Sequence, residues 1–169
     1  IASAQILPMK ATPKADIGFM LLTDDLHKAN RFEKQLCRAL GPDVLTPVYS
    51  YLSMTELSEY TTTEEQYAAE LTRDEGIAPG TPEMETKLEE FRKRIAKYNS
   101  DRLYPNMPDW PVFCFYPMSK RRNENQNWYH LDYESRRKLM AGHAKVGRTF
   151  AGRVRQLISG STGLEEWEW

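Results

Sequence analysis

The chain has 169 residues, of which 40% are hydrophobic and 28% are charged, and its formal net charge is −1. These values are typical of a globular protein with one ordinary domain or two small lobes that share a core. No run approaches the roughly 18 apolar residues of a membrane-spanning helix, and the first residues do not resemble a signal peptide. The sequence therefore predicts a cytoplasmic protein with no membrane span.

Residues 1–55 are expected to form a first lobe with the element order strand, strand, helix, strand. The stretches "AQILPMKA" and "ADIGFMLL" are typical of strands and are separated by a lysine and proline turn. A helix follows, which Thr23 or Asp24 can cap and which Gly41 and Pro42 end. The next stretch, "VLTPVYSYLSM", is rich in β-branched and aromatic residues and is predicted to be a strand.

Residues 56–110 are predicted to be an acidic connecting segment. They are polar and are interrupted by the turn-forming stretches "APGTPE" and "YPNMPDWP". One helix is predicted from about Glu83 to Tyr98. The remainder of the segment is predicted to be loop.

Residues 111–169 are expected to form a second lobe. "PVFCFYPM" is a short apolar run whose trailing proline is typical of a strand end. Asp132 can cap a helix that runs to about Ala151, with Gly152 as its stop. "RVRQLISGS" alternates like a strand, and "LEEWEW" is predicted to begin another.

The charged residues are distributed unevenly along the chain. Residues 56–90 contain eleven acids and two bases, whereas residues 116–155 contain ten bases and three acids. The basic stretch predicts an anionic ligand, although its run 136–138 is better explained as a solvated helix face. For bases beside the predicted strands, such as Lys120, both interpretations stay open. Because the whole chain is slightly acidic, we do not expect a dedicated nucleic-acid-binding protein.

The two cysteines, Cys37 and Cys114, lie in stretches that are predicted to be buried. Their spacing suits neither a disulfide framework nor a zinc site, so both are interpreted as small core residues. The sequence also has no glycine-rich phosphate loop, nucleophile elbow or paired metal-histidine motif. Hydrolase, kinase and dehydrogenase functions therefore have no supporting motif.

The stretch "LMAGHAKVGR" places a histidine on the apolar face of the predicted second-lobe helix. Helical spacing puts four residues on one stripe: Leu139, His143, Val146 and Phe150. A histidine in such a place is usually a core residue with its hydrogen bonds satisfied. Gly142 and Gly147 lie close to His143 along the helix, however. Because Gly147 has no side chain, it leaves room beside the imidazole for a large flat group. Heme iron commonly takes a neutral imidazole from a helix, so His143 is a candidate iron ligand.

Gln156 and Tyr116 are polar residues on faces of the predicted strands that are otherwise apolar. Gln156 shares its face with hydrophobic residues two positions away on either side, so burial would force its amide to find partners. A structural hydrogen bond to the backbone would satisfy that need as well as a ligand would. Tyr116 follows two apolar residues on its strand face, and packing alone would explain it, although a buried phenol also needs a partner.

Four stretches, taken together with the opening strand, helix and strand, carry a resemblance to a known family. They are "VYSYLSMTELSEY", "RLYPNMPDWPVFCFYPMSKRR", "NWYHL" and "LMAGHAKVGRTFAGRVRQLISGSTGLEEWEW". Their joint pattern resembles the chlorite dismutase family, and within it the coproheme decarboxylases that finish heme synthesis in many bacteria. The resemblance implies an α+β fold in which two ferredoxin-like lobes form a dimeric α/β barrel, and a ring of five chains. It further implies outer elements before "AQILPMKA" and after "WEW" that this sequence lacks.

The resemblance assigns roles to the polar residues singled out above. The family carries its iron on a helix histidine, which corresponds to His143. Gln156, thirteen residues later, corresponds to the residue that faces the open side of the iron. Chlorite-degrading relatives have arginine at that place, and a neutral glutamine cannot supply its charge, so the match favours the decarboxylases. The tyrosine that decarboxylases use near a propionate corresponds to Tyr116.

The same resemblance implies contacts with a substrate that is rich in carboxylates. Coproheme III carries four propionates where heme b carries two, and the family pattern assigns propionate contacts to Arg102 and Lys120. Met118 and Gln156 would lie nearby. Trp169 corresponds to a tryptophan close to the pocket, and no step of the reaction is assigned to it.

The implied reaction is the peroxide-dependent oxidative decarboxylation of coproheme III to heme b. Hydrogen peroxide would react at the ferric iron, and Tyr116 would become a radical that takes a hydrogen atom from a propionate. Lys120 would position the carboxylate or transfer a proton. The rest of the protein would orient the porphyrin and supply charge. Two other functions stay open: chlorite breakdown, which Gln156 disfavours, and a heme-binding module without turnover.

Overall fold

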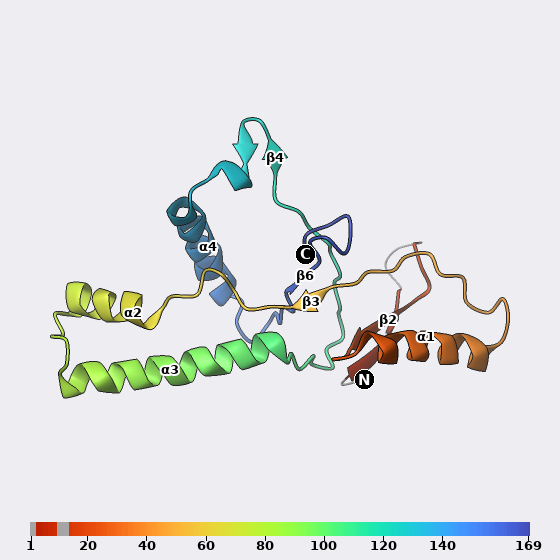
Figure 1. Ribbon diagram of the computed structural model, residues 1–169. Helices are drawn as coiled ribbons and strands as arrows, with labels where there is room; N and C mark the ends of the chain where they lie inside the picture. Colours follow the sequence, from red (N-terminus) through yellow and green to blue (C-terminus); the bar gives the residue numbers. More distant parts are fainter. Residues whose placement is uncertain (1–2, 10–13) are drawn as a thin grey trace. The chain divides into compact units, whose positions relative to one another are not determined.

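A computed structural model describes residues 3–9 and 14–169 of the chain (Figure 1). The described residues form a mixed α/β structure of helices and small two-stranded antiparallel sheets. The chain divides into two compact units. The first comprises Ile1–Tyr51 with Val112–Cys114, and the second comprises Leu52–Pro111 with Phe115–Trp169.

The first unit begins with a two-stranded hairpin. β1 (Ser3–Pro8) pairs antiparallel with β2 (Ile17–Leu22), and Ala4 lies opposite Leu21 in this register. Both strands were expected from their apolar sequence and are confirmed. Residues 10–11, the end of the predicted first strand, lie outside the described residues.

The helix of the first unit, α1 (Leu26–Leu40), is set by a local signal at each end. The carboxylate of Asp25 accepts a hydrogen bond from the backbone N–H of His27 at 2.7 Å, which makes Asp25 the N-cap. The predicted cap was Thr23 or Asp24, so the helix begins slightly later than expected. It ends at Gly41, whose φ of 95° is a backbone conformation that side chains disfavour. The predicted stop is confirmed.

Two expectations for the first unit are wrong. The stretch 44–53 has no strand, and pairing begins only at β3 (Met54–Thr55) in the second unit. Cys37 lies on α1, where none of the described helix residues is buried, and both it and Cys114 are exposed. The predictions failed because they rested on β propensity and apolar spacing, whereas burial depends on a packing partner.

A helical hairpin follows β3 in the second unit (Figure 1). It contains the buried hydrophobic residues of the described chain. It consists of α2 (Glu64–Glu70), a π-helical turn η1 (Leu71–Glu75) and α3 (Pro82–Leu103). α3 covers and extends the helix that was predicted, whereas α2 and η1 replace a predicted loop. Short-range signals explain both: a capping box joins Thr63 to Gln66, and Pro82 occupies the first turn of α3.

The core of the hairpin is small and apolar. Its buried side chains are Leu71, Ile77 and Met84, which are at most 6% exposed, with Tyr67, Ala68 and Leu88 packed around them. On the neighbouring turn of α3, Phe91 is 5% exposed and stacks on Tyr67 with ring centroids 4.5 Å apart. The hairpin thus buries a continuous apolar cluster between α2 and α3.

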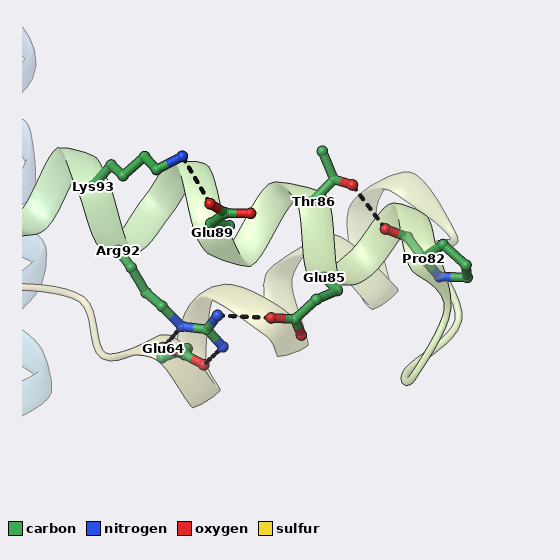
Figure 2. Close-up of polar contacts among 7 residues, drawn as sticks. All are labelled: Glu64, Pro82, Glu85, Thr86, Glu89, Arg92 and Lys93. Carbon is green, nitrogen blue, oxygen red and sulfur yellow. Dashed lines mark hydrogen bonds and ion pairs between the residues drawn. The ribbon is translucent and has the colours of Figure 1, made fainter.

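Ion pairs cross the exposed side of this hairpin, as Figure 2 shows. The guanidinium of Arg92 on α3 lies 2.6 Å from Glu64 on α2 and 2.7 Å from Glu85 on its own helix. Lys93 pairs with Glu89 at 2.8 Å within α3. The hydrogen bonds from Arg92 lower the pKa of the Glu64 carboxyl, and those to Glu64 and Glu85 raise the pKa of the guanidinium. The many acids of the segment are therefore partly neutralised by bases of α3.

The remainder of the second unit holds two short sheets and two helical segments. β4 (Arg122–Asn123) and β5 (Gln126–Asn127) form a tight hairpin, which leads into the short 3-10 helix η2 (Trp128–His130). α4 (Tyr133–Arg148) follows, and β6 (Ser159–Gly160) pairs antiparallel with β3.

The N-terminus of α4 is the predicted one, but its C-terminus is not. The Asp132 carboxylate accepts the backbone N–H of Ser135 at 2.8 Å, as an N-cap should. The helix ends at Arg148, with Thr149 as the C-cap, whereas the prediction was about Ala151. The turn with Gly152 comes only after this end.

The strands predicted in the second lobe are mostly wrong. The stretches 111–118 and 164–169 contain no strand. In the stretch 153–161, only the residues of β6 form a strand. A strand needs hydrogen bonds from a neighbour, and alternation in one segment does not show whether a neighbour exists. In the part of the chain that the structure describes, no helix is long and apolar enough to cross a membrane.

Candidate functional site

His143 lies on the second half of α4 and faces outward. None of the residues of α4, all of them described, is buried, and the apolar residues on its stripe are also exposed: Leu139 (56%), Val146 (62%) and Phe150 (46%). The expectation that this stripe covers a core is therefore wrong. Within the described residues, the imidazole of His143 has no hydrogen-bond or ion-pair partner. It is not the satisfied core histidine that its helical position suggested.

The surroundings of His143 are open. A Cβ built on Gly142 or on Gly147 would meet nothing within 4 Å. Among the described residues, no group of three histidine, cysteine, aspartate or glutamate side chains is arranged to hold a metal ion. A single imidazole on an unobstructed helix face with exposed apolar residues does fit an iron porphyrin, because the porphyrin itself supplies four ligands to the iron and needs an apolar surface. The residues present therefore fit this group.

Tyr116 and Gln156 meet, although 40 residues separate them in the sequence. The Gln156 amide nitrogen Nε2 donates a hydrogen bond to the Tyr116 hydroxyl oxygen at 3.0 Å. Both residues lie in segments without regular structure, and both are exposed, Tyr116 by 53%. The prediction that they are buried on strand faces is wrong, but the amide does have a partner, and that partner is the phenol.

The Lys120 ammonium lies between two indole rings. Its Nζ is 4.5 Å from the ring centroid of Trp128 and 4.8 Å from that of Trp169. Within the described residues, no carboxylate lies within ion-pair distance of this ammonium. Two aromatic faces hold the cation in place and leave its charge available to an external anion. We call Lys120, Trp128 and Trp169 the lysine cage.

Met118 is fixed through its backbone to the end of the described chain. Its N–H donates to the carbonyl of Trp169 at 2.8 Å, and its carbonyl accepts from the N–H groups of Glu168 and Trp169, each at 3.0 Å. The Met118 side chain itself is 49% exposed. The segment that follows Tyr116 is therefore tied to the "WEW" stretch by main-chain hydrogen bonds.

Arg102 lies in the last turn of α3 and is held by neighbours that carry no charge. Its Nε donates to the carbonyl of Glu56 at 2.8 Å, and its Nη1 donates to the hydroxyl of Tyr98 at 3.3 Å. The guanidinium carbon is also 5.9 Å from the Tyr98 ring centroid. In the described residues the guanidinium forms no ion pair, so its positive charge is uncompensated.

Sequence reasoning missed Glu168, the most heavily bonded acid of this region. Glu168 is only 5% exposed, and its carboxylate accepts from the Lys120 backbone N–H at 3.0 Å and from the Arg122 guanidinium. Burial raises its pKa, but hydrogen bonds from the Tyr129 hydroxyl, the Lys120 N–H and Arg122 outweigh it, so the pKa is lowered overall. The only sequence signal was the alternation of "WEW", in which the acid points away from the two tryptophans.

The structure thus brings the candidate residues together in two groups. Tyr116 contacts Gln156, and Lys120 contacts Trp128 and Trp169 next to the backbone of Met118. His143 and Arg102 make no direct contact with either group among the described residues. Chemically, the two groups offer a phenol with an amide donor, and a cation on an aromatic support, both at the surface.

Comparison with known proteins gives two findings. The family model described as chlorite dismutase matches residues 2–169, almost the whole chain. A solved structure of a heme-binding protein from Thermus thermophilus matches with a TM-score of 0.69 and 31% sequence identity. The match covers 98% of this chain and 54% of that one, so the chain spans about half the length of this relative. The chain belongs to the chlorite dismutase family, whose members are heme oxidoreductases.

Proposed function

We propose that the protein catalyses the peroxide-dependent oxidative decarboxylation of iron coproporphyrin (coproheme III) to heme b. The observation that carries the proposal is the hydrogen bond of 3.0 Å from the Gln156 amide to the Tyr116 hydroxyl. It joins the two residues that the family pattern puts at the open side of the iron and at the reacting propionate. The proposal keeps the cytoplasmic location, the two-lobe barrel and the five-chain ring that the resemblance implies.

The Gln156 amide leaves Tyr116 in a useful state. Because Nε2 donates to the phenol oxygen, the hydroxyl hydrogen of Tyr116 is free to leave in another direction. Glutamine also carries no charge, so it does not offer an oxyanion such as chlorite the permanent cation that arginine would. Both properties favour a hydrogen-transfer function for the pair over chlorite breakdown.

Two cations without carboxylate partners suit a substrate with several propionates. Lys120 sits on two aromatic rings, and Arg102 is oriented by a carbonyl and a phenol. Each can form a charge-assisted hydrogen bond with a carboxylate, and such bonds are about twice as strong as neutral ones. We assign them to propionates, and His143 to the iron.

The reaction balances with one peroxide for each carboxyl group. Bound iron porphyrin supplies the oxidising power of hydrogen peroxide. Tyr116 gives up its hydroxyl hydrogen atom and then takes one from the β-carbon of a propionate. Loss of a further electron breaks the bond to the carboxylate, which leaves as carbon dioxide, and a vinyl group forms. The two electrons reduce the peroxide to two waters, and Lys120 holds the carboxylate during these steps.

The test is an optical titration of the purified chain with iron coproporphyrin III, followed by peroxide and mass spectrometry. We expect a histidine-ligated spectrum and then loss of two carboxyl groups. Tyr116→Phe should bind the porphyrin normally but stop turnover. Tyr104→Phe, at a tyrosine that is 79% exposed, is the matched control and should keep both. An unchanged porphyrin mass after peroxide contradicts the proposal.

A heme-binding module without turnover is the second candidate. It is favoured by the 31% identical structural relative, which is a heme-binding protein. In that case the unaltered chain and Tyr116→Phe would bind iron coproporphyrin equally, and neither would change its mass. Chlorite breakdown is tested by adding chlorite to the chain that has bound iron coproporphyrin. A burst of oxygen would support that function.

A further inference from the structure

We propose that Glu168 is a positioning residue that holds the lysine cage together. The inference rests on the proposed function only for its catalytic consequence, because the positioning itself concerns the chain alone. Its basis is that the Lys120 backbone bonds to the Glu168 carboxylate, and that each tryptophan is linked to Glu168 through neighbouring residues.

The first anchor is on the lysine itself. The carboxylate oxygen Oε2 of Glu168 accepts the backbone N–H of Lys120 at 3.0 Å. This bond fixes the main chain from which the ammonium projects. Two residues earlier, the carbonyl of Met118 accepts the N–H of Glu168 at 3.0 Å, so the main chain and the side chain of Glu168 hold the same segment at two points.

The other two anchors reach the tryptophans. Trp169 follows Glu168 directly and exchanges backbone hydrogen bonds with Met118. Trp128 precedes Tyr129, whose ring lies 4.6 Å from the Arg122 guanidinium that bonds to the Glu168 carboxylate. The backbone N–H of Trp128 also donates to the carbonyl of Arg121 at 2.9 Å. Trp169 is thus joined to Glu168 through the main chain, and Trp128 is joined to it through the neighbouring arginines.

Glu168 itself is buried, although the side chain of its ion-pair partner Arg122 is 62% exposed. Its residue is 5% exposed, and its backbone carbonyl accepts the N–H of Ser161, which is fully buried, at 2.9 Å. The guanidinium of Arg122 bonds to the carboxylate and lies over the ring of Tyr129, with 4.6 Å to the centroid. Two donors, the Lys120 N–H and the Arg122 guanidinium, therefore meet on one buried acid, and a neutral amide in its place would point an N–H group at one of them.

The test compares Glu168→Gln with Glu166→Gln in the full chain without porphyrin. Glu166 is a neighbouring exposed acid whose side chain contacts only the Trp167 indole, at 3.1 Å, among the described residues. Hydrogen exchange of the Lys120 amide is followed by NMR. Loss of a hydrogen bond to a charged group should speed this exchange about tenfold to a hundredfold in Glu168→Gln and leave it unchanged in Glu166→Gln. The Met118 amide, which bonds to a backbone carbonyl, should keep its protection in both.

A second variant covers the case in which Glu168→Gln does not fold. Glu168→Asp keeps a charge beside Arg122 but is one methylene shorter, so it should also release the Lys120 amide. Unchanged exchange of that amide in a folded variant overturns the proposal. Equal acceleration at Met118 also overturns it, because the effect would then be general unfolding.

Turnover supplies the second readout. With iron coproporphyrin and peroxide, Glu168→Gln should lower kcat about tenfold or more while porphyrin affinity changes little, because misplaced Lys120 affects the reacting geometry. Unchanged kcat in a variant with a released Lys120 amide would overturn the catalytic consequence. If the unaltered chain shows no turnover but the amide is released, the proposed function fails and the positioning role stands.

Discussion

The helical hairpin and α4 use the same kinds of apolar residue in opposite ways. Among the described residues, the buried hydrophobic side chains, Leu71, Ile77, Met84 and Phe91, all belong to the hairpin and its connection. α4 buries none and leaves its apolar stripe exposed around His143. The hairpin therefore uses its apolar residues for stability, whereas those of α4 are exposed on the face to which we assign the iron porphyrin. Helical period predicted an apolar face on α4, but only a packing partner decides whether such a face is buried.

The largest expected effect is on the stability of the hairpin. Phe91→Ala should lower the free energy of unfolding by about 3 kcal/mol, because it removes a buried ring and leaves a cavity beside Tyr67. Urea unfolding followed by circular dichroism measures the change. The matched control is Phe150→Ala, at a phenylalanine that is 46% exposed just after α4. It should cost less than about 0.5 kcal/mol, as exposed sites usually do. Equal losses would remove the contrast between the two regions.

The second effect concerns the ligand and should leave stability intact. His143→Ala should weaken binding of iron coproporphyrin about a hundredfold or more and abolish the histidine-ligated spectrum, because no other described side chain near it offers an imidazole. Its urea midpoint should not move, since the ring is exposed and has no partner among the described residues. His130→Ala, at another exposed histidine, is the control. If that variant lost the spectrum instead, the ligand assignment would be wrong.

Local signals explain most of what the sequence predicted correctly. Asp132 and Gly41 mark helix ends through contacts within a few residues, so α4 and α1 were found with nearly correct limits. β3 and β6 pair Met54 with Gly160, and no pattern near either residue reveals such a distant partner. The predicted strands therefore mostly failed.

The candidate site was predictable only in part, for the same reason. The Tyr116 and Gln156 pair was expected through the family pattern and not through spacing, because the two residues are 40 positions apart. Glu168 was missed because an acid between two tryptophans looks like a surface residue until its donors are known. Its partners, at Lys120 and Arg122, come from a segment more than 40 residues earlier.

Tyr60 sharpens the contrast by showing that α4 is open only in its second half. The Tyr60 ring stacks on Tyr133, in the first turn of α4, at 5.8 Å and meets Trp128 edge-on at 6.3 Å. Burial, followed by the neighbouring Glu59, raises the pKa of the Tyr60 hydroxyl to about 12 from an ordinary value of 10.0.

A folded pKa above the unfolded one gives stability that is present below pH 10 and lost as the pH rises to about 12. We therefore expect the urea midpoint to fall across this interval, and to fall less in Tyr60→Phe. The exposed Tyr104→Phe control should retain the full loss. An identical alkaline profile for both variants would mean that the first turn of α4 is as open as the rest.

The smallest effect tests the charged side of the hairpin. Arg92→Gln removes the bridge between Glu64 on α2 and Glu85 on α3, so it should lower the urea midpoint slightly, and less at high salt, because the groups are exposed. Lys93→Gln breaks only the pair with Glu89 within α3 and should change the midpoint less.

The lowered pKa of Glu64 adds a pH signature: its contribution to stability is complete above the ordinary value of 4.5 and is lost as the pH falls through the lowered folded pKa. Lys93 lowers the pKa of the Glu89 carboxyl in the same way, so each variant should lose less stability on acidification than the unaltered chain does. If Arg92→Gln and the unaltered chain had the same urea midpoint and the same acid profile, the bridge would contribute nothing between the two helices, and the apolar cluster alone would close the hairpin.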